Sequence, residues 1–593
     1  MNATTAAAPA LESLRDRWRA AWPDALALWS PFTRLRPPVW CLTEEDEQRA
    51  GLTGSFAMIR LVDQTVVISL RQIAAEGLDD HPLEILGHEI GHHILCPADL
   101  ADNARMLARI RRALPSVEHR APMIGNLFAD ALINDRLQRA RSLDMAGVYE
   151  TLGGGADRLW TFYLRTYEIL WALPTRRLTV GELDDRIEGD AQLGARLIRS
   201  FAGRWLDGAG RYGALCLPYL LDHADDESER LWRVWQDATT AGAGGFPDGL
   251  TEIDPGEATG AVHPALDPEL NGELDRTAKD AARSAPEPQE GTERGSAGNY
   301  REPFQYGEIL RASGLDLTDH EVAMRYYRER AIGHLIPFPS RRAPVSTDPL
   351  PEGVETWDVG APLADIDWIE TITRSPVIVP GITTMRRKWG TGAGNEPDRV
   401  PVDLDLYIDS SGSMPDPQVT VSYLTLAGAI VALSALRAGA NVQATLWSGT
   451  NQFVTTNGFV RDEQSVLRVM TGFFGGATAF PIHITRDTFA ARTPSDPPAH
   501  VLIVSDEGVT TMYDRDEAGR DGGEVMRRAI EQAGGGATMV LNLWGELEND
   551  EKLLQAQREG WDIHVVREWA DLVAFARAFS RKQYEEPGTG AVR

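Results

Sequence analysis

The chain has 593 residues, 43% hydrophobic and 25% charged, which is ordinary for a globular protein of about three or four domains. Its formal net charge of −28 opposes binding to phosphate backbones, so we expect no nucleic-acid partner. None of its four lysines (Lys279, Lys388, Lys552 and Lys582) follows a glycine, which excludes the Gly-Lys-Ser/Thr loop of a P-loop ATPase.

The cysteines and the N-terminus favour a cytoplasmic protein. Cys41, Cys96 and Cys216 lie far apart and form no CxxC pair, as is typical of a reducing compartment. The N-terminal segment has no basic region followed by an apolar one, so we predict no secretory signal. The longest apolar run, Val419–Leu436, approaches the length of a membrane span. Because it contains serine and threonine, we interpret it as a buried helix and expect no membrane partner.

Residues 1–240 are predicted to form one mainly α-helical domain with a small sheet. Two short strands around a turn are expected in Phe56–Ser69, where β-branched residues are frequent. Pro97 is expected to end the first of the helices that follow. The first three of these helices are predicted over His81–Leu95, Ala98–Leu114 and Ala121–Ala140.

Two segments of different composition follow this domain. Residues 241–300 are rich in Gly, Pro, Ala, Asp and Glu and contain few large apolar residues. Such a segment cannot bury enough surface to offset its chain entropy, so we predict an acidic disordered linker. Residues 301–400 are predicted to be a mixed connecting region, to which we assign no chemistry.

Residues 401–585 are predicted to form an α/β domain. Short apolar strands alternate with helices there, which is typical of a parallel, doubly wound sheet. The predicted strands are Val402–Ile408, Val442–Trp447, His500–Val504, Ala537–Leu543 and Ile563–Val566. The predicted helices are Val419–Leu436, Gly523–Ala533 and Glu551–Glu559.

The first motif with chemical meaning is HEIGH at residues 88–92. On a helix, His88 and His92 share one face and can bind a single zinc ion, and Glu89 lies beside them as a potential general base. His93 is rotated about 100° from His92, and Cys96 lies where the helix should end. We interpret His93 as structural and Cys96 as a packing residue.

A catalytic zinc ion needs a third protein ligand and an open position. Asn126, Asp130 and Asn134 form a polar stripe at helical spacing, and such a stripe needs a partner when it is buried. We predict Asp130 as the third zinc ligand, with Asn126 or Asn134 supporting the ligands by hydrogen bonds.

The second motif follows the first strand of the α/β domain. Asp409, Ser411 and Ser413 form the pattern D-x-S-x-S, and Thr478 and Asp506 lie in later loops. These segments follow predicted parallel strands, whose carboxyl ends place ligands at one edge of a sheet. Two carboxylates and three hydroxyl groups suit a hard cation and leave a position for an outside carboxylate. We therefore predict a Mg²⁺ site, which Mn²⁺ could also fill.

The second half resembles a von Willebrand factor type A (VWA) domain, a Rossmann-like fold, over Val402–Phe579. The resemblance implies a complete metal-ion-dependent adhesion site formed by Asp409, Ser411, Ser413, Thr478 and Asp506. The first half, over about residues 50–140, is similar to the bacterial zincin-like metallopeptidase domain that often precedes a VWA-like domain. The N-x-x-x-D-x-x-I-N-x-x-L helix of that family is matched by Asn126, Asp130, Ile133, Asn134 and Leu137.

These features leave three functions open. The first is a zinc-dependent peptidase in which Glu89 is the catalytic base and the VWA domain recruits a partner or substrate through Mg²⁺. The second is a non-catalytic adaptor or chaperone-like subunit of an AAA+ ATPase complex, and the third is a metal-chelatase-type assembly. Related VWA proteins commonly work beside MoxR-type AAA+ ATPases, which implies such a partner for a chain without its own P-loop. Glu89 favours the peptidase, because a structural zinc site needs no base.

Overall fold

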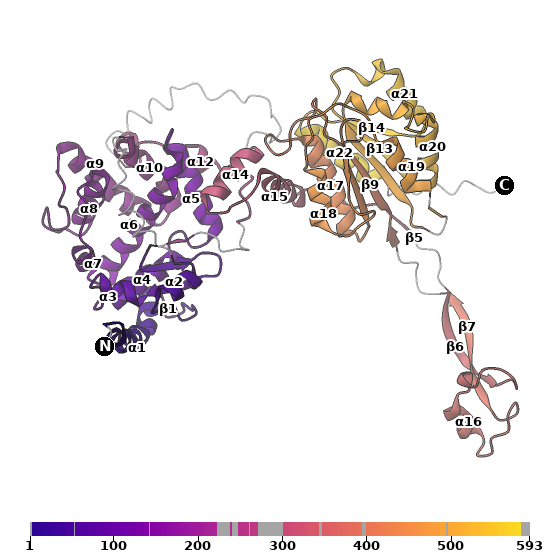
Figure 1. The fold of residues 1–593 in the computed structure, drawn as a ribbon, viewed down its shortest axis with the longest axis horizontal. Helices are drawn as coiled ribbons and strands as arrows, with labels where there is room; N and C mark the ends of the chain where they lie inside the picture. Colours follow the sequence, from indigo (N-terminus) through magenta and orange to yellow (C-terminus); the bar gives the residue numbers. More distant parts are fainter. Residues whose placement is uncertain are drawn as a thin grey trace. The chain divides into compact units, whose positions relative to one another are not determined.

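The computed structural model divides into two compact units. Unit 1 comprises Met1–Arg330 and Asp416–Val421, and unit 2 comprises Ala331–Pro415 and Ser422–Arg593 (Figure 1). The structure describes residues 3–52, 54–141, 143–221, 238–239, 247–259, 261–270, 300–342, 347–393, 399–490, 492–493 and 496–582.

Unit 1 is mainly helical and contains one small sheet, as the sequence predicts. The strand order is β1-β3-β2-β4, and β2 and β3 form the expected antiparallel pair. The strands are β1 (Val39–Cys41), β2 (Ala57–Arg60), β3 (Thr65–Ser69) and β4 (Ala238–Thr239). The longer helices after the sheet are α4 (Pro82–Ile94), α5 (Leu100–Ala113), α6 (Ala121–Arg141), α7 (Met145–Leu152), α8 (Arg158–Leu170), α9 (Asp185–Phe201) and α10 (Trp205–Leu221). The remaining helices that begin in unit 1 are α1 (Ala3–Trp29), α2 (Glu44–Ala50), α3 (Leu70–Ala75), α12 (Pro255–Thr259), α14 (Pro303–Ala312) and α15 (Asp319–Ile332).

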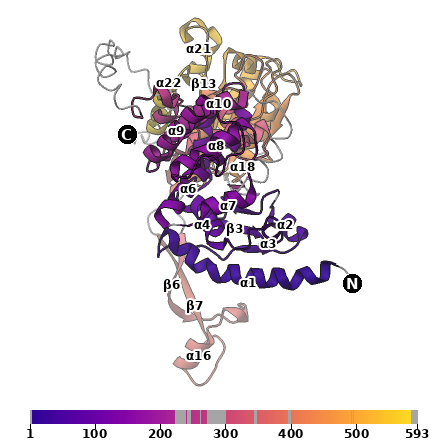
Figure 2. The same ribbon diagram turned by 90° about the vertical axis from the view of Figure 1, so that its left-hand side faces the viewer.

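Helix α1, which the sequence analysis does not predict, packs against α4 and α3 (Figure 2). Its tryptophans Trp18, Trp22 and Trp29 are all buried in the same apolar core as much of the sheet. The indole Nε1 of Trp29 donates a hydrogen bond to the carbonyl oxygen of Gly87 at 2.8 Å. Helix α1 therefore packs against α4 at Gly87 and Gly91.

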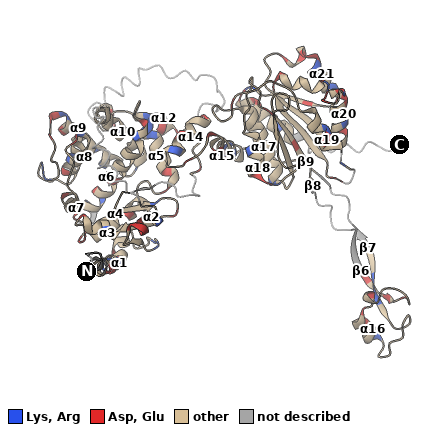
Figure 3. Cartoon of the chain, in the orientation of Figure 1, with Lys and Arg blue, Asp and Glu red and all other residues tan. Residues whose placement is uncertain are grey.

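Residues 247–259 and 261–270 fold onto unit 1, although we expected them in a disordered linker. The arginines of α5 are blue beside α12 in Figure 3, and Arg109 donates to both carboxylate oxygens of Asp254 at 2.8 Å. Leu270 is buried in the core of the helices. The segment is ordered because Asp254 pairs with an arginine and because Leu250 and Leu270 are buried, which composition alone does not reveal. The rest of the expected linker lies outside the described residues.

Unit 2 contains the predicted α/β sheet. Its six strands lie in the order β11-β10-β9-β12-β13-β14, and all neighbouring pairs are parallel except β10 with the short β11. The strands are β9 (Asp403–Asp409), β10 (Val442–Trp447), β11 (Phe453–Thr455), β12 (Ala499–Ser505), β13 (Gly534–Leu541) and β14 (Asp562–Val565). The helices are α17 (Tyr423–Arg437), α18 (Glu463–Met470), α19 (Ile482–Ala490), α20 (Gly522–Ala533), α21 (Glu551–Arg558) and α22 (Trp569–Lys582).

Helices cover both faces of this sheet. Helix α17 packs on β9 beside α18 and α22, whereas α19, α20 and α21 share an apolar core with Tyr407 and Ile503 on the other face. Nearly every residue of α17 is buried, which explains why the longest apolar run of the sequence lies there. Among the residues that the structure describes, no helix has the length and apolarity needed to cross a bilayer.

The expected connecting region, residues 301–400, contains more regular structure than composition indicates. It includes α14, α15 and a two-stranded ribbon whose strands β6 and β7 flank the short helix α16. A second short antiparallel pair is formed by β5 and β8. The bounds are β5 (Ser340–Arg342), β6 (Thr347–Thr356), α16 (Trp368–Arg374), β7 (Met385–Ala393) and β8 (Arg399–Pro401).

Candidate metal centres

The first centre begins with helix α4. Pro82 occupies its first turn, where the missing N–H costs nothing, and the helix ends at Ile94, before Pro97. His88 and His92 lie one turn apart on the same face, so their imidazoles project side by side. Both rings are buried, His88 at 8% and His92 at 0% exposure.

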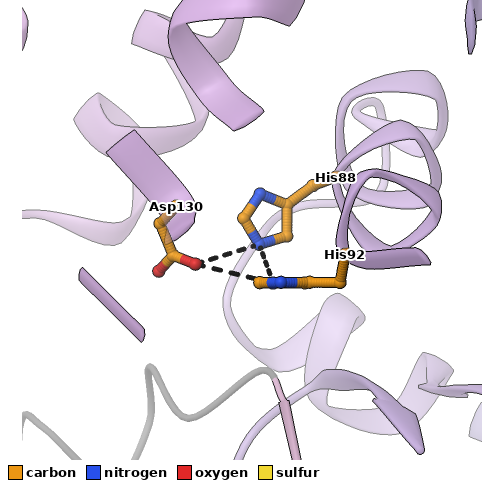
Figure 4. A group of neighbouring side chains, drawn as sticks. All are labelled: His88, His92 and Asp130. Atoms are coloured by element: carbon orange, nitrogen blue, oxygen red, sulfur yellow. Dashed lines mark hydrogen bonds and ion pairs between the residues drawn. The ribbon is translucent and has the colours of Figure 1, made fainter. Parts of the chain in front are cut away.

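Helix α6 supplies the third residue. The carboxylate of Asp130 projects toward both imidazoles, as Figure 4 shows. Its Oδ1 lies 3.6 Å from Nε2 of His88 and 3.5 Å from Nε2 of His92, and the two Nε2 atoms are 3.2 Å apart. The structure thus brings together the three residues that the sequence analysis assigned to zinc.

These separations fit one tetrahedral ion. Ligand atoms at 2.0–2.1 Å from zinc, the usual range for histidine and carboxylate ligands, are about 3.3–3.4 Å apart in a tetrahedron. The three observed separations, 3.2, 3.5 and 3.6 Å, lie close to this value. Three protein ligands leave the fourth position open, as in catalytic zinc sites.

The other ring nitrogen of each histidine fixes its tautomer. Nδ1 of His88 donates to Oδ1 of Asn134 at 2.7 Å, and Nδ1 of His92 donates to the carbonyl oxygen of Cys96 at 3.0 Å. Both Nε2 atoms therefore present lone pairs to the centre. Burial and, to a smaller extent, the neighbouring His88 lower the pKa of His92 to about 3, so this ring stays neutral. Two lone pairs and a carboxylate at these distances favour a cation between them.

Both asparagines of the polar stripe support the ligands. Asn126 donates through Nδ2 to Oδ2 of Asp130 at 3.0 Å, while Asn134 holds His88. The sequence analysis left open which of the two would do this, and the structure shows that each supports a different ligand.

A cluster of buried tyrosines orients Asn134, and sequence reasoning missed its role. Nδ2 of Asn134 donates to the hydroxyl oxygens of Tyr149 and Tyr167, each at 3.0 Å. The hydroxyl of Tyr163 lies 2.7 Å from that of Tyr167, so the hydroxyl groups form a connected network. Because both amide hydrogens face hydroxyl oxygens, Oδ1 of Asn134 must face His88. Buried hydroxyl groups need partners, but the i, i+4 spacing of Tyr163 and Tyr167 does not by itself reveal which groups they meet.

The other candidate ligands have separate partners. Nδ1 of His93 donates to Oε1 of Gln64 at 2.7 Å, and the thiol of Cys96 lies 3.9 Å from the sulfur of Met106. Neither belongs to the His88, His92 and Asp130 cluster. Both residues therefore have the structural roles that we expected.

Glycines let the supporting helices approach α4 closely. A Cβ at Gly91 would lie 2.5 Å from Ile133 on α6 and 2.7 Å from the ring of Trp29 on α1. A Cβ at Gly87 would lie 3.0 Å from Leu28. The glycine inside HEIGH is therefore required by the close contact between α4 and α6, which also brings Asp130 to the histidines.

Glu89 lies next to the ligand His88 in the sequence of α4. Its side chain is 1% exposed and, together with His88, lines a small cavity. A buried carboxylate in a cavity that it shares with a metal ligand is a candidate general base.

The second centre lies at the carboxyl edge of the unit 2 sheet. Asp409 ends β9, and Asp506 follows the adjacent strand β12. The Oγ atoms of Ser411 and Ser413 are 3.1 Å apart, and Ser413 Oγ donates to Oδ2 of Asp506 at 2.5 Å. Thr478 lies near Asp506, since a Cβ on Gly508 would fall 2.3 Å from the methyl group of Thr478 and 2.8 Å from Oδ1 of Asp506.

Hydrogen bonds orient the two carboxylates of this centre. Oδ1 of Asp409 accepts from the backbone N–H of Ser411 at 2.8 Å, and its Oδ2 accepts from Ser505 Oγ at 2.6 Å. Ser505 was not among the residues we expected at this site. Burial and, to a smaller extent, nearby Asp506 raise the pKa of Asp409 to about 6 despite these donors. A bound cation would offset the free-energy cost of ionising the buried Asp409. A donor set made only of oxygen atoms suits Mg²⁺ or Mn²⁺.

No protein-family model matches the chain, and neither does any curated protein. Its function is therefore inferred from the residues of the two centres.

Proposed function

We propose that the protein is a zinc-dependent metallopeptidase with a zincin-like unit 1 and a VWA-like unit 2. The observation that carries this proposal is the buried triangle of His88, His92 and Asp130, whose donor separations suit tetrahedral zinc, beside the carboxylate of Glu89. A purely structural zinc site needs ligands but no base, and it is normally closed by a fourth protein ligand.

The residues of the centre have distinct roles in this proposal. A bound zinc ion would polarise the scissile carbonyl and lower the pKa of the attacking water. Glu89 would take the proton from that water and deliver it to the leaving amine. Asn134 and Asn126 would hold His88 and Asp130 in the orientation that binding requires.

Unit 2 would recruit a protein partner or substrate. Asp409, Ser411, Ser413, Thr478 and Asp506 would hold Mg²⁺ or Mn²⁺, with a carboxylate of the partner completing the coordination. We propose a MoxR-type AAA+ ATPase as one such partner, because the chain lacks its own P-loop lysine. We place the protein in the cytoplasm, where its three free, buried cysteines would remain reduced.

The decisive experiment compares zinc content and peptide cleavage in three purified full-length proteins: the wild type, Glu89→Gln and the double variant His88→Ala/His92→Ala. We expect zinc and cleavage in the wild type, zinc without cleavage in Glu89→Gln, and neither in the double variant. Glu84→Gln, a matched change elsewhere on α4, should retain both.

Two outcomes would contradict the proposal. Zinc retained by the double variant would refute the ligand assignment. Zinc bound by the wild type without cleavage of any peptide in a mixed library would refute catalysis, and would favour the adaptor or chaperone-like role.

A further inference from the structure

A small apolar cavity adjoins the first centre. Its volume is about 30 Å³, and it is lined by His88, Glu89 and Asn134 together with the apolar side chains of Phe56, Ile85, Met145, Val148 and Tyr149. Each of these five side chains is at most 6% exposed. The cavity therefore joins the proposed catalytic base to an apolar wall.

Helices α4 and α7 contribute most of the apolar side chains that line the cavity. Ile85 lies one turn before Glu89 on α4, and Met145 lies one turn before Val148 and Tyr149 on α7. Residues at such i, i+3 and i+4 spacing share a helix face. The cavity is thus positioned by the same helix that carries His88 and Glu89.

The polar side chain of Asn134, which lines the cavity, already has hydrogen-bond partners. Asn134 uses Oδ1 for His88 and Nδ2 for the hydroxyls of Tyr149 and Tyr167. A polar side chain entering the cavity would lose its water and find few groups to replace it, which is costly. Binding of an apolar side chain would instead be favourable, because its transfer from water into an apolar cavity lowers the free energy.

The volume limits the size of the entering group. At about 30 Å³ the cavity is small, so it suits a small aliphatic side chain such as that of alanine or valine rather than a phenylalanine ring.

We propose that this cavity is the specificity pocket of unit 1 and takes a small aliphatic side chain beside the scissile bond. This inference rests on the proposed metallopeptidase function. It names the substrate class as peptides with alanine or valine at the position that enters the pocket, with no preference for charged residues there.

The test uses N-acetylated amino-acid hydroxamates, because the hydroxamate group binds zinc and the side chain is then the only variable. Binding of the glycine, valine, aspartate and phenylalanine compounds to zinc-loaded full-length protein is measured by calorimetry. We expect the valine compound to bind at least about 10-fold more tightly than the glycine compound. The aspartate and phenylalanine compounds should bind no better than glycine.

Two variants test the pocket itself. Met145→Ala enlarges it and should raise affinity for the phenylalanine compound about 10-fold, leaving the glycine compound unchanged. Met58→Ala is the control, since Met58 is also buried but belongs to a different apolar cluster, with Cys41, Leu52 and Val67. It should leave all four affinities unchanged.

The outcomes separate this inference from the proposed function. Equal binding of all four compounds, or a Met145→Ala protein with unaltered preference, would overturn the pocket even if peptides are cleaved. The expected preferences without any peptide cleavage would support the pocket and refute catalysis. Absence of binding by every compound would overturn the pocket, because the centre would then be closed to substrates.

Discussion

Replacing Asn134 with leucine tests how the first centre is held. The two side chains have the same number of non-hydrogen atoms, but leucine cannot accept the hydrogen bond that Nδ1 of His88 donates at 2.7 Å. His88 can then move its proton to Nε2, which lies 3.2 Å from Nε2 of His92. That proton would occupy the position that the zinc ion needs.

The size of the expected loss in zinc affinity follows from the burial of His88 and Asn134. Leaving a buried donor without an acceptor costs about 1–3 kcal/mol. Loss of a residue that supports a metal ligand typically weakens binding by about 10–100-fold, equivalent to about 1.4–2.7 kcal/mol. Because His88 is only 8% exposed, water replaces the amide poorly, and we expect a loss near the upper end of this range.

The assay is competition for zinc against a chromophoric chelator, with circular dichroism to show that the variant is folded. Gln64→Met is the matched control, because Gln64 accepts from Nδ1 of His93 at the same 2.7 Å but outside the centre. The control should bind zinc like the wild type. A folded Asn134→Leu protein with wild-type zinc affinity would refute the reasoning.

Three further predictions concern pH, packing and the second centre. Burial raises the pKa of Asp405 to about 7, against 3.8 when unfolded, so the folded state retains a proton that the unfolded chain releases. Relative to Asp405→Asn, the unfolding free energy of the wild type should fall by about 3 kcal/mol between pH 4 and pH 7. Calorimetric pH profiles that run parallel for the two proteins would contradict this. Gly91→Ala should cost about 1–3 kcal/mol in urea unfolding, because its Cβ would lie 2.5 Å from Ile133. Gly189→Ala, at a helical position with open space, should instead stabilise. Asp409→Ala should abolish Mg²⁺ binding in calorimetry without unfolding unit 2, and unchanged Mg²⁺ affinity would exclude the second centre.

Much of the fold could be predicted because local patterns encode it. Helical spacing in the sequence placed His88 and His92 on one helix and Asp130 on another. Runs of apolar residues placed β9 and β12, whose ends carry Asp409 and Asp506. These predictions depend on periodicity and on proline and glycine positions, which act over a few residues.

Other features depend on contacts between distant segments and were missed or misjudged. The fold of residues 247–259 depends on Arg109, more than 100 positions earlier in the chain. Ser505 reaches Asp409 only because parallel strands bring their ends together. Composition and periodicity carry no information about such partners.

The sequence by itself determined which residues have the chemistry of a metal centre and on which helices or strands they lie. Only the tertiary structure decided that Asn134 accepts a hydrogen bond from His88, whereas Asn126 donates one to Asp130. It also decided that Tyr149 and Tyr167 fix the orientation of Asn134. The physical reason is that a hydrogen bond depends on distances of about 3 Å between atoms. Periodicity places a side chain on a face of its helix, but only the packing of the helices against one another sets those distances.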